Sequence, residues 1–117
     1  MTHSILIVDD HAGFRRSARA LLEAEGFDVV GEAATGRAAL VEVERLHPRV
    51  VLLDIQLPDL DGFAVVSALA ATTRPPVIIL ISSRDRGSYE PQLATADVLG
   101  FIPKSRLSGA AVRELTG

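Results

Sequence analysis

Apolar residues gather in short runs along the chain, and the segments between the runs carry apolar residues at helical spacing. Four runs stand out, at 5–8, 50–53, 77–81 and 98–102, and residues 27–33 form a fifth candidate. Runs of this length with little polar interruption are typical of strands that are covered on both faces. The pattern therefore predicts five buried strands.

The segments between the strands carry the signals of helix starts and ends. Thr35 and Ser108 suit the N-caps of the second and the last helix, and a third helix begins near Gly62. Gly26 and Pro48 suit the ends of the first and the second helix. The residues expected to face the core are Phe14, Ala18, Leu21 and Leu22, then Leu40, Val43 and Leu46, then Phe63, Val66, Leu69 and Ala70, and finally Ala111 and Leu115. Helices that alternate with strands in this way predict a doubly wound α/β fold with a parallel sheet.

The length of 117 residues indicates a single domain, which we place at residues 1–117. The chain is 48% hydrophobic but only 4% aromatic, so the core is expected to be aliphatic. A net charge of -3 disfavours a free-standing nucleic-acid binder, because neutralising phosphates usually needs a basic surface. The chain has no cysteine and no apolar segment long enough to span a membrane. We therefore expect a cytoplasmic protein that has no membrane partner.

Three acidic residues follow two of the predicted strands directly. Asp9 and Asp10 follow the run 5–8, and Asp54 follows the run 50–53. If the two strands are neighbours, carboxylates about 4 Å apart repel by roughly 4 kcal/mol at an effective dielectric constant of 20. Such a cluster needs a positive partner or a carboxyl group that gives up its charge. This indicates a site for a divalent cation around a reactive aspartate.

Two further polar residues end up at the same edge of the predicted sheet. In an open α/β sheet, the ligand crevice lies beyond the carboxyl ends of the strands. Ser82 follows the run 77–81, and Lys104 comes two residues after the run 98–102. We therefore expect a hydroxyl group and a cation close to the three carboxylates. Taken alone, each of the acids is equally well explained as a turn former or a helix N-cap. Lys104 alone is better explained as a solvated surface residue, and only its placement favours a role in the site.

The sequence resembles a response-regulator receiver domain of two-component signalling along essentially its whole length. The motifs that carry the resemblance are ILIVDD at 5–10, VLLDIQLP at 51–58, DG at 61–62, Ser82, and GFIPK at 100–104. DDH at 9–11 and VGEA at 30–33 are further similar to the NarL/FixJ subfamily, whose receivers usually precede a DNA-binding domain that this chain lacks. The resemblance implies a flavodoxin-like fold, with a five-stranded parallel sheet in the order 2-1-3-4-5 and five helices.

The resemblance also implies a phosphoryl-transfer site. Asp54 would accept a phosphoryl group from a phosphohistidine, and Lys104 would pair first with Asp54 and then with the phosphoryl group. Mg²⁺ would be held by Asp9, Asp10, Asp54 and the main-chain oxygen of Gln56, since Mg²⁺ prefers hard oxygen ligands. The implied donor is a histidine kinase or a histidine phosphotransfer protein. The chain would be a signalling phosphoacceptor rather than an enzyme.

In the family, phosphorylation moves a hydroxyl and an aromatic side chain, and here these would be Ser82 and Phe101. The coupled movement would repack the face formed by the segment 86–97, the fifth strand and the last helix, which would bind a second receiver or control transcription. DNA would be reached only through an output domain outside this chain. Gln56 and Arg84 are the candidates for setting the lifetime of the acyl phosphate.

Two other functions are compatible with the same residues. A pseudo-receiver would be an interaction module that is never phosphorylated, but it would normally lose an acid or the lysine. A hydrolase with an aspartyl-phosphate intermediate typically has a second acid two residues after the nucleophile, where this chain has Gln56.

Several neighbouring residues are given structural roles. His11 is expected to be a loop residue, because imidazole matches a hard Mg²⁺ site poorly. Asp59 and Asp61 are expected to shape their loop and cap the third helix. Pro91 interrupts the segment 86–97, so the fourth helix is expected to be short or shifted. Arg15, Arg16 and Arg19 form a basic stripe, which is interpreted as a solvated face or, secondarily, a kinase-docking surface.

Overall fold

The computed structural model describes residues 3–117, which form a five-stranded parallel sheet in the order β2-β1-β3-β4-β5. The strands are β1 (Ser4–Val8), β2 (Asp28–Ala33), β3 (Val50–Asp54), β4 (Val77–Ser82) and β5 (Gly100–Pro103). The helices are α1 (Ala12–Ala24), α2 (Gly36–Leu46), α3 (Gly62–Ala70), α4 (Glu90–Leu93) and α5 (Gly109–Thr116), with the short 3₁₀ helices η1 (Arg86–Tyr89) and η2 (Lys104–Arg106). The predicted fold class and strand order are confirmed.

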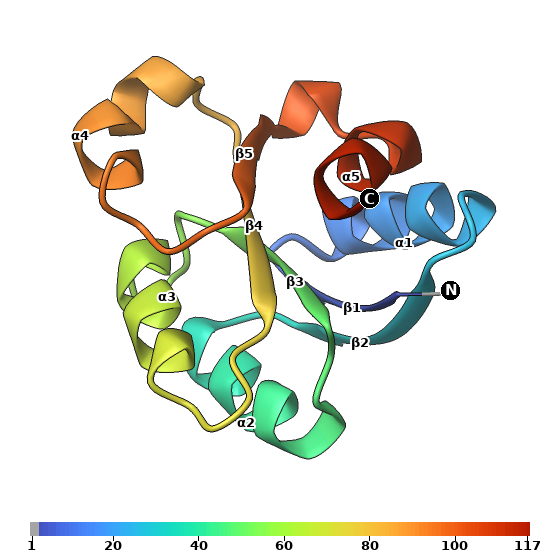
Figure 1. Cartoon of the computed structure of the whole chain (residues 1–117). Helices are drawn as coiled ribbons and strands as arrows, with labels where there is room; N and C mark the ends of the chain where they lie inside the picture. The colour runs from blue at the N-terminus through green and yellow to red at the C-terminus, as the bar shows by residue number, and fades with distance from the viewer. Residues whose placement is uncertain (1–2) are drawn as a thin grey trace.

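The sheet separates two apolar layers, because successive side chains of a strand point to opposite faces. Figure 1 shows α2 and α3 on one face of the sheet and α1 and α5 on the other, while α4 lies near β5 at the edge. The strand residues that face α2 and α3 include Leu6, Val8, Val51, Leu53, Ile78 and Leu80. Those that face α1 and α5 include Ile5, Ile7, Val50, Leu52, Ile79 and Ile81. These fully or almost fully buried side chains explain why the strands read as continuous apolar runs.

Local signals in the sequence place most helix ends correctly. The hydroxyl groups of Thr35 and Ser108 accept hydrogen bonds from the main-chain N–H groups of Ala38 and Ala111, both at 3.0 Å, so both predicted N-caps are confirmed. α2 ends at Leu46, and its C-cap His47 has a left-handed φ of 48°. Pro48 disfavours a right-handed helical conformation for the residue before it, which accounts for this sharp end.

Two expectations about facing residues are wrong, and one core residue was missed, each by about one position. Leu21 is 44% exposed, since α1 faces the sheet through Ala18 and Leu22. Ala70 is exposed, whereas Val65, which the apolar stripe omitted, is fully buried. Each residue turns a helix by roughly 100°, so a residue next to a buried one lies at the border of the apolar stripe.

The segment before β5 differs most from a regular βα unit. α4 has only four residues, and Pro91 lies in its first turn, where a missing N–H costs little. The short fourth helix is thus confirmed, although Pro91 lies near its start rather than interrupting it. β5 starts at Gly100, two residues later than the predicted run.

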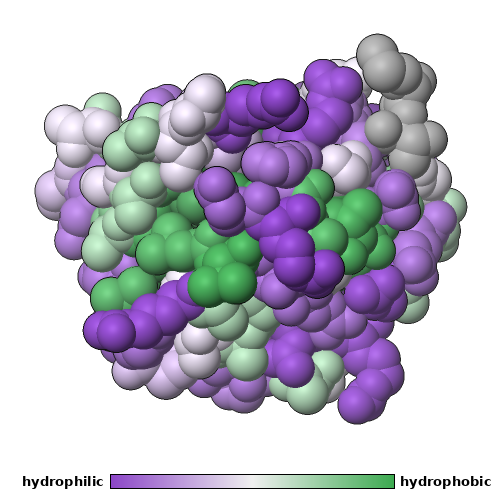
Figure 2. Space-filling view, turned by 90° about the horizontal axis from the view of Figure 1, so that it is seen from below, coloured by the Kyte–Doolittle hydropathy of each residue, from purple (hydrophilic) through white to green (hydrophobic). Residues whose placement is uncertain are grey.

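Apolar side chains also reach the surface. Seen from below in Figure 2, the side on which α2 lies in Figure 1, an apolar area at the centre is bordered by polar side chains. On α2, Val41 is 63% exposed and lines a shallow hollow with Leu40, Glu44 and Arg45.

Within residues 3–117, no helix combines the length and apolar character that crossing a bilayer requires.

Candidate functional site

Four of the candidate residues lie at the carboxyl edge of the sheet because of where their strands end. Asp54 and Ser82 are the last residues of β3 and β4, whereas Asp9 and Lys104 directly follow β1 and β5. β1, β3, β4 and β5 are consecutive in the sheet and parallel. Residues up to 95 positions apart in the chain are therefore brought to one edge.

Lys104 joins two buried carboxylates at this edge. Its Nζ atom lies 2.5 Å from Oδ2 of Asp9 and 3.2 Å from Oδ2 of Asp54. Asp9 is fully buried and Asp54 is 3% exposed. The ammonium group also lies 4.6 Å from the ring centroid of Phe14, a cation–π distance. One cation thus compensates two carboxylates that have almost no access to water.

This arrangement raises the pKa of Asp54 and the pKa of Lys104. Burial raises the pKa of the Asp54 carboxyl above its ordinary value and Asp9 adds to this, although the N–H of Gln56 and Lys104 oppose it. Burial lowers the pKa of Lys104, but the two carboxylates together outweigh burial and leave that pKa raised. Charge on Asp54 is therefore disfavoured at rest, so a further cation near it would be stabilising.

The loop after β1 brings Asp10 and His11 to the same site. Oδ1 of Asp9 accepts a hydrogen bond of 2.8 Å from the main-chain N–H of His11. The His11 ring nitrogen Nδ1 lies 3.3 Å from Asp9 Oδ1 and 3.0 Å from Asp10 Oδ1. His11 is thus a contact of both acids rather than only a loop residue.

The residues at this loop fit a hard divalent cation. One potential ligand atom from each of Asp9, Asp10 and His11 lies within 4.8 Å of the others. Oδ2 of Asp9 is buried and has no N–H or O–H donor in hydrogen-bonding geometry within residues 3–117, so Lys104 alone compensates it there. Carboxylate oxygens with spare acceptor capacity suit Mg²⁺. The imidazole group of His11 suits it less well.

Gln56 and Arg84 border the site through their main chains. The N–H of Gln56 donates to Oδ1 of Asp54 at 3.0 Å, and the N–H of Arg84 donates to Oγ of Ser82 at 3.1 Å. Both residues are exposed, so their side chains have access to solvent at the mouth of the site. Their effect on acyl-phosphate lifetime and the role of the Gln56 main-chain oxygen in metal binding stay predictions.

A tyrosine that the sequence analysis did not single out contacts Ser82. Ser82 is fully buried, and its Oγ atom lies 2.9 Å from the hydroxyl oxygen of Tyr89. The Tyr89 ring packs between Phe63, at a centroid distance of 6.1 Å, and Phe101, at 5.9 Å. The signal in the sequence was the isolated Tyr89 itself, since it is the chain's only tyrosine and its hydroxyl needs a partner when buried.

The basic stripe on α1 is not simply a solvated face. Arg15 and Arg19 each donate through Nε to the Glu32 carboxylate, at 2.9 and 2.8 Å. Arg15 also donates to the main-chain oxygen of Asp9 at 2.6 Å, and its side chain is only 18% exposed. Of the three arginines only Arg16 is exposed. Arg15 therefore links the acidic loop to β2.

Glu32→Gln is expected to lower the free energy of unfolding by about 1 kcal/mol near pH 7, because an amide cannot compensate two guanidinium groups. Hydrogen bonding by Arg19, then by Arg15, holds the pKa of Glu32 below its ordinary value. The contribution is thus present above the ordinary pKa of a glutamate and lost as the pH falls through the lowered value. Urea unfolding at pH 7 and at pH 3 measures this.

The exposed Glu44 on α2 provides the matched control for that experiment. Glu44→Gln should change stability little at either pH. A loss in Glu32→Gln that is the same at both pH values would contradict the electrostatic explanation.

The two aspartates of the loop before α3 cap different helices. Asp61 accepts a hydrogen bond of 2.7 Å from the N–H of Phe63, so its predicted role as the α3 cap is confirmed. The prediction that Asp59 caps the third helix is wrong, because its carboxylate accepts from the N–H groups of Gly36 and Arg37, at 2.8 and 3.0 Å. Asp59 therefore caps α2, to which its negative charge is also favourable.

With this geometry in place, comparison with known proteins identifies the class. The family model of the response regulator receiver domain matches residues 5–112, so the chain belongs to the receiver domains of two-component response regulators. Receiver domains interact with histidine kinases and output domains, and they generally bind Mg²⁺ at their acidic pocket.

The chain is similar to receivers that are coupled to different outputs. The signal receiver domain of the putative response regulator NarL from Mycobacterium tuberculosis has a TM-score of 0.87 at 30% identity, covering 99% of this chain and 98% of that one. A putative transcriptional regulator of Pseudomonas aeruginosa is 33% identical over 86% of this chain and 48% of its own length. A protein-glutamate methylesterase/protein-glutamine glutaminase of Methanococcoides burtonii is 40% identical over 85% of this chain and 29% of its own length. The chain thus spans half or less of the length of these two curated relatives.

Proposed function

We propose that Asp54 is the phosphoacceptor of this receiver and takes its phosphoryl group from the phosphohistidine of a histidine kinase or a histidine phosphotransfer protein. The observation that carries the proposal is the pairing of one half-buried lysine, Lys104, with the buried carboxylates of Asp9 and Asp54. A buried carboxylate beside an ammonium group is suited to attack an anionic phosphoryl group, because the ammonium group compensates negative charge on the carboxylate and on the phosphoryl oxygens.

The transfer step forms a bond from a carboxylate oxygen of Asp54 to phosphorus and breaks the bond from phosphorus to the histidine nitrogen. The imidazole leaves with the bonding electron pair and takes a proton from solvent. Mg²⁺, held by Asp9, Asp10, Asp54 and the main-chain oxygen of Gln56, would supply compensation for the negative charge of the incoming group. Lys104 turns from the Asp54 carboxylate to a phosphoryl oxygen, which keeps its ammonium group paired.

The response of the domain begins at Ser82. A phosphoryl group adds a charge of about -1.5 to -2 and three strong acceptors, which attract the Ser82 hydroxyl group. Phe101 is buried beside Tyr89, so a movement of Ser82 is transmitted to the face formed by α4, β5 and α5. This face would bind a second receiver or an output module that controls transcription. The protein would act in the cytoplasm. Gln56 and Arg84 would set how long the acyl phosphate lasts.

Acetyl phosphate with Mg²⁺ should add one phosphoryl group to the protein, and Asp54→Asn should abolish the gain. Intact mass measured under mild acid, in which acyl phosphates survive, reads the outcome directly. Asp28→Asn removes an exposed carboxylate at the start of β2 and should leave the mass gain unchanged. An unmodified mass in the wild-type protein despite demonstrated Mg²⁺ binding would favour the pseudo-receiver instead.

A further inference from the structure

One buried side chain anchors the long connection between β4 and β5. Between Ser82 and Phe101, Tyr89 is the only buried residue, at 7% exposure. α4, which follows it directly, has no buried residue of its own. Leu93 and Val98 of this connection are only partly buried against the same core, so Tyr89 is its most deeply held side chain.

The hydroxyl of Tyr89 and that of Ser82 are partners in the structure. Their oxygens are 2.9 Å apart, and Ser82 Oγ also accepts the N–H of Arg84. Among the described residues, Ser82 Oγ has no hydrogen bond to Asp54 or Lys104, so it is turned towards Tyr89 rather than into the acidic pocket. Phe101 has no hydroxyl and cannot respond to Ser82 by a hydrogen bond.

We propose that Tyr89 is the positioning residue that holds the Ser82 hydroxyl in the resting state, and that losing this hydrogen bond on phosphorylation releases the segment 86–97. The proposal rests on Asp54 being the phosphoacceptor. Rotation of Ser82 Oγ towards a phosphoryl group takes it away from the Tyr89 hydroxyl. A buried hydroxyl without a partner is unfavourable, so the Tyr89 side chain moves until its hydroxyl reaches water.

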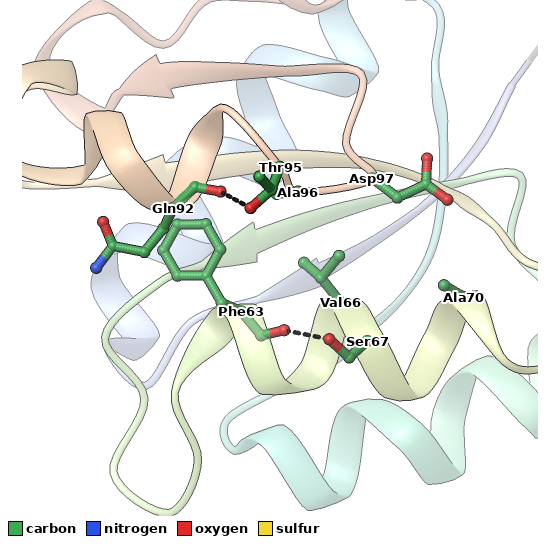
Figure 3. Close-up of a pocket in the computed structure, with 8 residues that line it drawn as sticks. All are labelled: Phe63, Val66, Ser67, Ala70, Gln92, Thr95, Ala96 and Asp97. Atoms are coloured by element: carbon green, nitrogen blue, oxygen red, sulfur yellow. Dashed lines mark hydrogen bonds between the residues drawn. The ribbon is translucent and has the colours of Figure 1, made fainter.

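The surroundings of Tyr89 permit this movement. Phe63, which the Tyr89 ring contacts, also lines a hollow of about 300 Å³ between α3 and the segment 92–97. Figure 3 shows Phe63 and Gln92 at one end of this hollow and Ala70 and Asp97 at the other. The only side-chain hydrogen bonds drawn there, from Thr95 to the Gln92 carbonyl and from Ser67 to the Phe63 carbonyl, are each local to one segment. Among these eight residues no hydrogen bond ties α3 to the segment 92–97, so none of them opposes a shift of the segment towards the hollow.

The chain carries its own probe for this proposal, because it has one tyrosine and no tryptophan. Tyrosine fluorescence therefore reports Tyr89 alone. In wild-type protein treated with acetyl phosphate and Mg²⁺, acrylamide quenching of this emission should rise at least twofold, and amide hydrogen exchange at 86–97 should accelerate. Intact mass on the same sample confirms that the phosphoryl group is present.

Two variants separate a switch from a mere structural contact. Ser82→Ala removes the partner hydroxyl, so quenching should be high before phosphorylation and unchanged by it. Tyr89→Phe keeps the ring but has no hydroxyl that can be left without a partner, so its hydrogen exchange at 86–97 should be the same with and without the phosphoryl group. Ser83→Ala, which alters an exposed neighbouring hydroxyl, should respond like the wild type.

A phosphorylated wild-type protein with unchanged quenching and unchanged exchange would overturn the role of Tyr89 while leaving Asp54 as the phosphoacceptor. A wild-type protein that gains no mass would overturn both proposals. Low quenching in unmodified Ser82→Ala would show that Ser82 does not hold Tyr89.

Discussion

Lys104→Ala is expected to lower the free energy of unfolding by about 3–5 kcal/mol, the cost typical of removing one partner of a buried ion pair. Asp9 and Asp54 both lose the ammonium group that compensates them, and neither has appreciable access to water. Burial and Asp9 already raise the pKa of Asp54. Without a cation beside them, keeping both carboxylates charged would therefore be costly.

Urea unfolding at pH 7 in the presence of a chelator measures this loss. Arg106→Ala removes the same charge from an exposed position two residues further along the chain and should cost well under 1 kcal/mol. A Lys104→Ala loss no larger than that of Arg106→Ala would show that the two carboxylates do not depend on Lys104.

Mg²⁺ should stabilise Lys104→Ala more than it stabilises the wild type, because the cation replaces the missing positive charge. At a free Mg²⁺ concentration 100 times the dissociation constant, a ligand that binds only the folded state stabilises it by about 2.7 kcal/mol. Equal stabilisation of the two proteins would show that bound Mg²⁺ does not replace the positive charge of Lys104.

The convergence of these residues was predictable because it depends on topology rather than on side-chain detail. Asp9, Asp54 and Lys104 each lie at or just after a strand end, and parallel strands place such ends at one edge. Apolar runs fixed the positions of the strands, and the turn chemistry of Thr35 and Ser108 fixed two helix starts. All of these signals are local in the sequence.

The features that were missed depend on contacts between distant segments. Asp59 caps α2 across 23 residues of sequence, and nothing next to Asp59 indicates this. Glu32 pairs with Arg15 and Arg19 only because β2 lies beside α1. Tyr89 is buried although its neighbours in sequence are exposed, so no periodic pattern marked it.

Gly62→Ala is expected to destabilise the protein by about 3 kcal/mol, because its site has no room for a side chain. A Cβ atom at Gly62 would lie 2.6 Å from Cα of Ile55 and 2.9 Å from the main-chain oxygen of Asp54. Both atoms belong to the backbone, which cannot rotate away as a side chain can. The N–H of Gly62 also donates to the main-chain oxygen of Ile55 at 2.7 Å. The start of α3 is thus packed directly against the main chain of Asp54 and Ile55.

Urea unfolding of Gly62→Ala should therefore show the loss together with weaker Mg²⁺ binding, since moving α3 displaces the chain at Asp54. Gly13 provides the matched control, because a Cβ there meets nothing within 4 Å and lies in the first turn of α1. Gly13→Ala should be neutral or stabilise by up to about 1 kcal/mol, the difference in helix propensity between the two residues. Full stability in Gly62→Ala would contradict the prediction, because it would mean that α3 can move away from β3 without loss of packing. If Mg²⁺ binding were weakened in that fully stable variant, the substitution would affect only the geometry at Asp54.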